Sequence, residues 1–406
     1  LDACPALQKN FPLRQIALHA VIGEDVERAR RYGLQVLDEL ARDNANTQTL
    51  DFLHHLYDLL APSAPAEELW RLARALGQVH QTLGQVGEAA AWYERERQYA
   101  EEMGDVMAQV IAYFAAGELA LVANNYDDAA QAANKGLSLS SSLPDEQHVS
   151  LMARGHRLLG AALAMEGSDL SAAEHHLQEA VAAHRLSDNR EDLCAVLFEL
   201  GNVAAQRGEI ARALDLYEEA AKAAEAAHVY YFQALAYNNL AYHSLLLGQL
   251  EAAQSALTRG YALAERHQMF GALLHLASTR GEILLYREEW AEAWTTFQNG
   301  LTLAEELGNL ERQAGFRAGL ALAARGQGRI EEAISLLEEA LLLISERGYW
   351  HLRTRLQLWL AETLLLDGRR GEAAVHLDAA LQTAREHGRA HLLAQGERLS
   401  ASMMVN

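Results

Sequence analysis

The apolar residues of this chain recur with helical spacing, and the pattern returns at a fixed interval. Between Gly281 and Phe297 the apolar side chains keep a helical rather than an alternating spacing, which predicts helices and not strands. When the chain is compared with itself, an alanine recurs every 40 residues, with one step of 44. This alanine column consists of Ala89, Ala129, Ala173, Ala213, Ala253, Ala293, Ala333 and Ala373. A period of this length predicts an array of small helical repeats.

Three further columns keep register with the alanine. A turn residue, usually a glycine such as Gly208, stands five positions before it. A small residue such as Gly77 or Gly201 stands twelve before it, and another small residue stands seven after it, where Glu96 breaks the pattern. Small residues allow two helices to approach closely, and a glycine suits the left-handed conformation that ends a helix. Each repeat is therefore predicted to be two helices joined by a tight turn.

These columns resemble the tetratricopeptide repeat over residues 66–388, with a period of 40 instead of the usual ~34. The longer period is similar to that of the repeats in kinesin light chains and in the maltose-regulon activator class. The resemblance implies an all-α solenoid of about eight helix pairs that forms a right-handed superhelix; another type of helical repeat is the alternative. We predict an N-terminal helical segment with a degenerate half-repeat over 1–62, eight repeats over 63–390 and a capping helix over 391–406.

Composition narrows the classes of function. Lys and Arg number 34 against 55 Asp and Glu, a net charge of −21, which disfavours direct binding to nucleic acid or to an anionic membrane. Cys4 and Cys194 lack metal or disulfide spacing and are typical of a reducing compartment, so a cytoplasmic location is expected. No apolar run reaches the ~18 residues of a membrane-spanning helix. Because the chain begins at Leu1, we expect it to be a piece of a longer protein.

The sequence contains no motif that indicates catalysis. Phosphate-binding loops, nucleophile elbows, zinc-protease motifs and EF-hand loops are all missing. The adjacent pairs His54–His55 and His175–His176 point about 100° apart on a helix, so neither pair chelates one ion easily. We therefore predict no cofactor and no metal site. A non-catalytic interaction protein is favoured over an enzyme.

In tetratricopeptide arrays the first helix of each repeat lines the concave side. Counting from the small residue of that helix, the inner positions lie three and six before it and one and four after it. The candidate binding residues at inner positions are Arg71, Arg74, Phe114, Arg154, Arg157, Phe198, Asn202, Asn238 and Tyr242. Arginine suits carboxylate or phosphate groups, and an asparagine amide can hold an extended peptide backbone. The alternative is that the arginines pair with acidic residues of neighbouring helices.

The predicted function is a scaffold that binds a protein segment, a peptide or a small ligand in the groove. The repeat resembles the C-terminal sensor arm of bacterial signal-transduction ATPases with numerous domains, which implies a role in signal transduction and transcription regulation. The alternative is a peptide-pheromone receptor that contracts around its peptide, a hypothesis motivated by Tyr237, Asn238, Asn239 and Asn202. The isolated chain is expected to be a monomer, because each repeat contacts only its neighbours.

Overall fold

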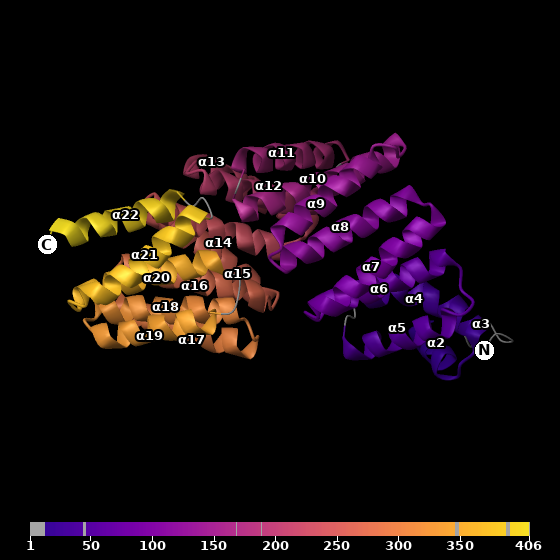
Figure 1. Ribbon diagram of the computed structural model, residues 1–406, viewed down its shortest axis with the longest axis horizontal. Coiled ribbons are helices and arrows are strands. Elements are labelled where there is room, and N and C mark those ends of the chain that lie inside the picture. The colour runs from indigo at the N-terminus through magenta and orange to yellow at the C-terminus, as the bar shows by residue number, and fades with distance from the viewer. Residues whose placement is uncertain are drawn as a thin grey trace. The chain divides into compact units, whose positions relative to one another are not determined.

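Helices make up all the regular secondary structure in the computed structural model, which describes residues 13–43, 46–167, 169–187, 189–345, 349–386 and 390–405 (Figure 1). The helices are α2 (Leu13–Ile22), α3 (Val26–Arg28), the π-helical η1 (Ala29–Gly33), α4 (Leu34–Asp43), α5 (Thr47–Leu60), α6 (Ala66–Thr82), α7 (Val86–Met103), α8 (Val106–Val122), α9 (Tyr126–Ser140), α10 (Asp145–Glu166), α11 (Leu170–Leu186), α12 (Arg190–Gln206), α13 (Ile210–Ala227), α14 (Tyr230–Leu246), α15 (Leu250–Arg266), α16 (Phe270–Tyr286), α17 (Trp290–Glu306), α18 (Leu310–Gly326), α19 (Ile330–Leu343), α20 (Trp350–Leu366), α21 (Arg370–Glu386) and α22 (Ala390–Val405).

The chain divides into an N-terminal unit, Leu1–Ala162, and a C-terminal unit, Leu163–Asn406. In the N-terminal unit α6 packs against α7 and α8 against α9, while α4 and α5 contact α6. In the C-terminal unit the packed pairs are α12 with α13, α14 with α15, α16 with α17, α18 with α19, and α20 with α21. Within each unit these pairs also contact the next pair along the chain, α7 with α8 in the first unit and α13 with α14 through α19 with α20 in the second. A solenoid buries in this way apolar faces that no pair can bury alone. The predicted all-α repeat fold is confirmed.

The sequence columns have the packing roles that their residue types predict. All eight members of the alanine column are 0% exposed. A Cβ atom added at Gly201 would lie 2.6 Å from the ring of Tyr217, so the small residue of the first helix is needed for close packing. At the turn column, Gly208 has a left-handed φ of 81°, and Asn124 and Glu288 adopt φ values of 59° and 60° at two other turns. The repeat therefore arises from steric requirements at a few positions.

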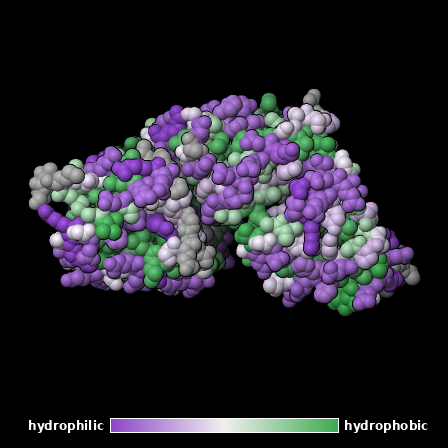
Figure 2. Space-filling view, viewed as in Figure 1, coloured by the Kyte–Doolittle hydropathy of each residue, from purple (hydrophilic) through white to green (hydrophobic). Residues whose placement is uncertain are grey.

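The surface is mainly hydrophilic, with smaller hydrophobic patches, on the face that Figure 2 shows. None of the described helices combines the length and the apolarity needed to cross a membrane. The described residues also contain no group of three or more His, Cys, Asp or Glu side chains that could hold a metal ion. Polar side chains at the inner positions of the repeats are therefore the first candidates for a binding site.

Candidate functional site

Three inner positions of the N-terminal unit form an ion-pair cluster. Arg154 on α10 donates from Nε and Nη2 to the two carboxylate oxygens of Glu118 on α8, at 2.9 and 2.7 Å. Arg157 adds a second cation, with Nη2 3.5 Å from Glu118 Oε1. Burial favours the neutral form of Glu118, but hydrogen bonds and charge from Arg154 prevail and hold its pKa below the usual value. Arg154 and Arg157 therefore pair with an acidic residue of a neighbouring helix, which is the alternative that the sequence left open.

The remaining candidate residues of the N-terminal unit, Arg71, Arg74 and Phe114, make other contacts. Arg71 donates from Nη2 to the carbonyl oxygen of Leu34 at 3.0 Å. The Arg74 guanidinium lies 5.6 Å from the centroid of the Trp70 ring. Phe114 is 0% exposed, and a Cβ atom at Gly155 would come within 2.6 Å of its ring. Phe114, which we expected to line the groove, is therefore a core residue with no surface for a partner.

Glu96 on α7 is a functional candidate that the sequence did not place in the site. It is 0% exposed, and neither of its carboxylate oxygens has a hydrogen-bond partner among the described residues. Burial raises the pKa of Glu96 to about 7, and the charges of Arg74 and Arg154 oppose that shift only in part. The signal was present in the sequence, because Glu96 is the exception in a column of small residues.

In the C-terminal unit a chain of hydrogen-bonded side chains crosses the first helices of three consecutive repeats, α12, α14 and α16. Asn202 Oδ1 accepts from the Tyr217 hydroxyl at 2.8 Å and from Asn239 Nδ2 at 2.9 Å. Asn238 Nδ2 donates to Asn239 Oδ1 at 3.1 Å, and its Oδ1 accepts from the Thr279 hydroxyl at 2.8 Å. We call Asn202, Asn238, Asn239, Tyr217 and Thr279 the amide chain. It carries no formal charge.

Aromatic residues flank the amide chain. The half-buried Phe198 lies 5.8 Å from the Tyr217 ring, centroid to centroid. Tyr242, also half-buried, packs edge-on against His243 at 5.1 Å. Burial raises the pKa of the Tyr242 hydroxyl and lowers the pKa of His243 to about 4, so both side chains are neutral near pH 7. The structure thus brings Phe198, Asn202, Asn238 and Tyr242 into one uncharged region, in which Asn238 is only 7% exposed.

The next repeats along the chain carry a group of charged side chains, Glu282, Arg312 and Arg355. Glu282, at an inner position of α16, is half-buried, and no described residue forms a hydrogen bond or ion pair with it. Burial raises its pKa, while the positive charges of Arg355 and Arg312 act in the opposite direction. Arg312 Nη2 lies 2.9 Å from His275 Nδ1, and burial, followed by the Arg312 charge, lowers the pKa of His275 to about 3. The spacing alone gave no signal for Arg312, which lies outside the inner positions.

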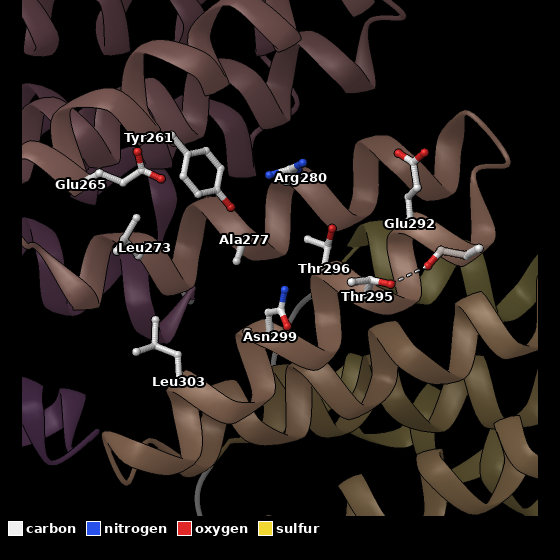
Figure 3. Close-up of a pocket in the computed structure, with 12 residues that line it drawn as sticks. Tyr261, Glu265, Leu273, Ala277, Arg280, Glu292, Thr295, Thr296, Asn299 and Leu303 are labelled. Carbon is white, nitrogen blue, oxygen red and sulfur yellow. Dashed lines mark hydrogen bonds between the residues drawn. The ribbon is translucent and has the colours of Figure 1, made fainter.

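A pocket of about 620 Å³ opens on a different side of the C-terminal unit, between α15, α16 and α17 (Figure 3). Its lining from α16 consists of Leu273, Ala277 and Arg280. Because successive residues on a helix point about 100° apart, Ala277 faces away from the inner position Glu282, five residues further along. The pocket is therefore distinct from the region around the amide chain.

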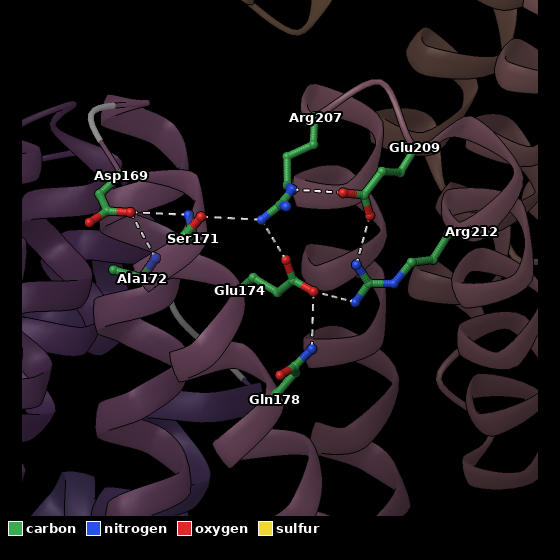
Figure 4. A network of polar contacts seen from close by, with 8 residues as sticks. All are labelled: Asp169, Ser171, Ala172, Glu174, Gln178, Arg207, Glu209 and Arg212. Carbon is green, nitrogen blue, oxygen red and sulfur yellow. Dashed lines mark hydrogen bonds and ion pairs between the residues drawn. The ribbon is translucent and has the colours of Figure 1, made fainter.

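A second polar network connects the turn of one repeat with the next (Figure 4). Glu174 on α11 accepts from Arg207 at 2.8 Å and from Arg212 at 2.5 Å, and both arginines also pair with Glu209 at 2.8 Å. Two arginines and two glutamates thus satisfy one another. This arrangement stabilises the packing of α11 against the turn between α12 and α13 and leaves no charge in excess.

The stacked helix pairs, the buried alanine column and the positive-φ turns together define a tetratricopeptide-like α-solenoid. No protein-family model matches this chain, and no curated protein matches its sequence. Solved structures do match. A Rap protein complexed with competence and sporulation factor is 14% identical with a TM-score of 0.63, and the match covers 89% of this chain and 99% of that one.

Two further solved structures resemble the chain to a similar degree. Aspartyl phosphate phosphatase F from Bacillus subtilis is 13% identical with a TM-score of 0.61, over 80% of this chain and 91% of that chain. The Rap conjugation gene regulator of plasmid pLS20, in complex with the Phr* peptide, is 16% identical with a TM-score of 0.59, over 84% and 95%. At these identities the likeness concerns the fold.

Proposed function

We propose that this chain is a non-catalytic regulator that binds an extended peptide along the amide chain of its C-terminal unit. The observation that carries the proposal is the run of asparagine side chains on two consecutive first helices, α12 and α14, which Thr279 continues on α16. An asparagine amide both donates and accepts, as a peptide group does, so a row of amides can bond to successive groups of a backbone. The Nδ2 group of Asn202 bonds to no described residue, and in the proposal it donates to a peptide carbonyl.

The surroundings support a peptide with both an apolar and a charged side chain. Phe198 and Tyr242 offer half-buried rings, and Glu282 with Arg355 offers half-buried charges for ligand groups of opposite sign. A structural neighbour solved with the Phr* peptide supports the same class of ligand. In the N-terminal unit, Arg71 and Arg74 remain proposed contacts for acidic groups, whereas Arg154 and Arg157 are engaged with Glu118 and contribute less.

The finer role follows from the resemblance of the repeat rather than from the geometry. The chain would act as the ligand-sensing arm of a larger cytoplasmic regulatory protein, similar to the sensor arms of the maltose-regulon activator class. Peptide binding would then alter the contacts of that arm with the rest of the protein. As an isolated chain it is expected to be a monomer, which light scattering during size-exclusion chromatography would test.

Selection of random heptapeptides displayed on phage tests the peptide proposal. The full chain is used as bait, and enriched peptides are measured against Asn202→Asp, which keeps the acceptor oxygen Oδ1 but replaces the donating Nδ2 group with a second oxygen. The added negative charge faces a peptide carbonyl, so affinity should fall more than about tenfold, or ~1.4 kcal/mol. Gln298→Glu, at an exposed position of α17, introduces the same charge as a control. Peptides that bind both variants and the parent equally would refute the proposed site.

A further inference from the structure

The pocket between α15, α16 and α17 is open because one repeat lacks a side chain that its neighbours have. The fifth, sixth and seventh repeats have α14, α16 and α18 as their first helices. Four positions before the small residue of that helix, they carry Tyr237, Ala277 and Arg317. Tyr237 is 5% exposed, and Arg317 is half-buried. Both fill the space between consecutive second helices, whereas the methyl group of Ala277 leaves it empty as the floor of the pocket.

The neighbouring repeats show how such a slot holds a side chain. The Tyr237 ring lies 4.2 Å from the Arg259 guanidinium, and its hydroxyl accepts a hydrogen bond from Arg259 at 2.5 Å. Arg317 instead pairs with Glu305 at 3.0 Å and approaches Glu339 at 4.0 Å. The fold therefore accepts either a stacked aromatic ring or a paired guanidinium at this place.

The lining of the sixth repeat favours an aromatic ring. Where the neighbouring repeats have Gln233 and Gln313, the pocket has Leu273, and Leu303 lies beside it (Figure 3). Where they have the charged Arg259 and Glu339, the pocket has Asn299. Glu265, which matches Glu305, still lines the pocket, but the second carboxylate that Arg317 approaches is replaced by Asn299. Leu273 and Leu303 provide apolar surface for a ring.

Arg280 supplies a cation at the edge of this surface. It replaces a leucine found in both neighbouring repeats, Leu240 and Leu320. Arg280 is exposed, and its guanidinium lies 5.9 Å from the centroid of Tyr261. In Figure 3 the two side chains lie side by side over Ala277. A ring that entered the pocket would lie within reach of this cation, as the Tyr237 ring lies against Arg259.

We propose that this pocket is a second binding site, which receives a tyrosine or phenylalanine side chain from a partner protein. The site lies on a different face of α16 from Glu282 and does not involve the amide chain, so it is independent of the peptide proposal. Leu273 and Leu303 contact the ring, Arg280 covers it, and Asn299 and Thr296 offer hydrogen bonds to a phenol or to the backbone beside it.

The test uses N-acetyl-tyrosinamide as the probe and saturation-transfer NMR on the full chain. Ring protons of the probe should receive saturation from the parent protein. Ala277→Tyr places in the slot the side chain that Tyr237 has one repeat earlier, so ring saturation should fall at least about tenfold. Arg280→Ala should weaken it several-fold. The matched control is Ala252→Tyr, at an exposed alanine of α15 outside the pocket, which should bind the probe as the parent does.

Circular dichroism and the melting temperature of each variant establish that the fold is retained; Ala277→Tyr should melt no lower than the parent, because it fills a void. Three results would overturn the proposal. The first is the absence of ring saturation in the parent, and the second is equal ring saturation in Ala277→Tyr and the parent. The third is tighter, competitive binding of N-acetyl-argininamide to the parent, which would assign the slot to a cation.

Discussion

The N-terminal and C-terminal units place different chemistry at the same register of the repeat. Arg157 and Asn238 both stand three positions before the small residue of their first helix. Arg157 shares Glu118 with Arg154, whereas Asn238 belongs to an uncharged chain of amides. Register therefore assigns a side chain to a face, but the surrounding residues decide what it bonds to: a carboxylate for Arg157, and a hydroxyl and an amide for Asn238.

The two units also differ in how they accommodate buried polarity. The N-terminal unit encloses Glu96, a carboxyl group with no hydrogen-bond partner among the described residues. The C-terminal unit satisfies Asn238 through Thr279 and Asn239. An unsatisfied buried carboxyl destabilises the fold when it ionises, whereas a satisfied amide does not depend on pH. The contributions of these two sites to stability should therefore respond differently to pH.

The largest expected effect concerns Glu96 and pH. Its pKa in the folded chain is about 7 against a usual value of 4.5, so the folded state favours the protonated form. Stability is then complete below about pH 4.5 and decreases as the pH rises towards 7. Glu96→Gln removes this loss, which amounts to at most about 3 kcal/mol at ~1.36 kcal/mol per pKa unit. Urea unfolding of parent and variant at pH 4.5 and pH 8 measures the difference.

The control is Glu94→Gln on the same helix. Hydrogen bonds from Arg97 lower the pKa of Glu94, so its contribution has the opposite sign and diminishes as the pH falls. A Glu96→Gln variant with the same pH dependence as the parent would mean that Glu96 is ionised and paired in the folded chain.

The next effect concerns the ion-pair cluster. Arg154→Ala leaves the half-buried carboxylate of Glu118 without its two-hydrogen-bond partner, which should lower the free energy of unfolding by about 2–3 kcal/mol. Arg97→Ala removes a comparable pair, but its carboxylate partners Glu94 and Glu101 are about half exposed, so the cost should stay under ~1 kcal/mol. Equal losses in urea unfolding would show that Arg154 is an ordinary surface arginine.

The fold could be predicted from the sequence because steric rules act column by column. An alanine at a helix crossing and a glycine at a positive-φ turn are required by local geometry, and Ala293 and Gly208 have these roles in the structure. Such requirements are visible in a single chain when they recur at a constant spacing.

A variant pair tests whether this core column is equivalent in the two units. Ala129→Leu and Ala293→Leu each add a large side chain at a position that is 0% exposed. Overpacking should lower the free energy of unfolding by about 1–3 kcal/mol in both, with helicity retained. Thermal melts followed by circular dichroism provide the measurement. A variant with the melting temperature of the parent would show that its alanine does not lie at a close helix crossing.

The candidate site was less predictable because pairing depends on residues far apart in the sequence. Register placed Arg154 at an inner position but did not indicate that Glu118, 36 residues earlier, would accept hydrogen bonds from its Nε and Nη2 groups. Phe114 has the same register as the half-buried Phe198, yet it lies in the core against Gly136 and Gly155. The size of the side chain on the facing helix, and not the period, made this difference.

The smallest expected effect tests whether the amide chain acts as a unit in peptide binding. Thr279 is 4% exposed, so it should not contact a peptide. Its hydroxyl donates a hydrogen bond to the side-chain oxygen Oδ1 of Asn238 at 2.8 Å. Thr279→Val keeps the shape and removes that donor, which leaves the Asn238 amide less well oriented. Affinity for a phage-selected peptide should fall about fivefold, corresponding to ~1 kcal/mol for one hydrogen bond. Thr258→Val, whose exposed hydroxyl bonds only within its own helix, should leave the affinity unchanged. If both variants bind like the parent in fluorescence anisotropy, Asn238 is oriented by its other contacts, and the peptide would depend on Asn202 and Asn239 alone.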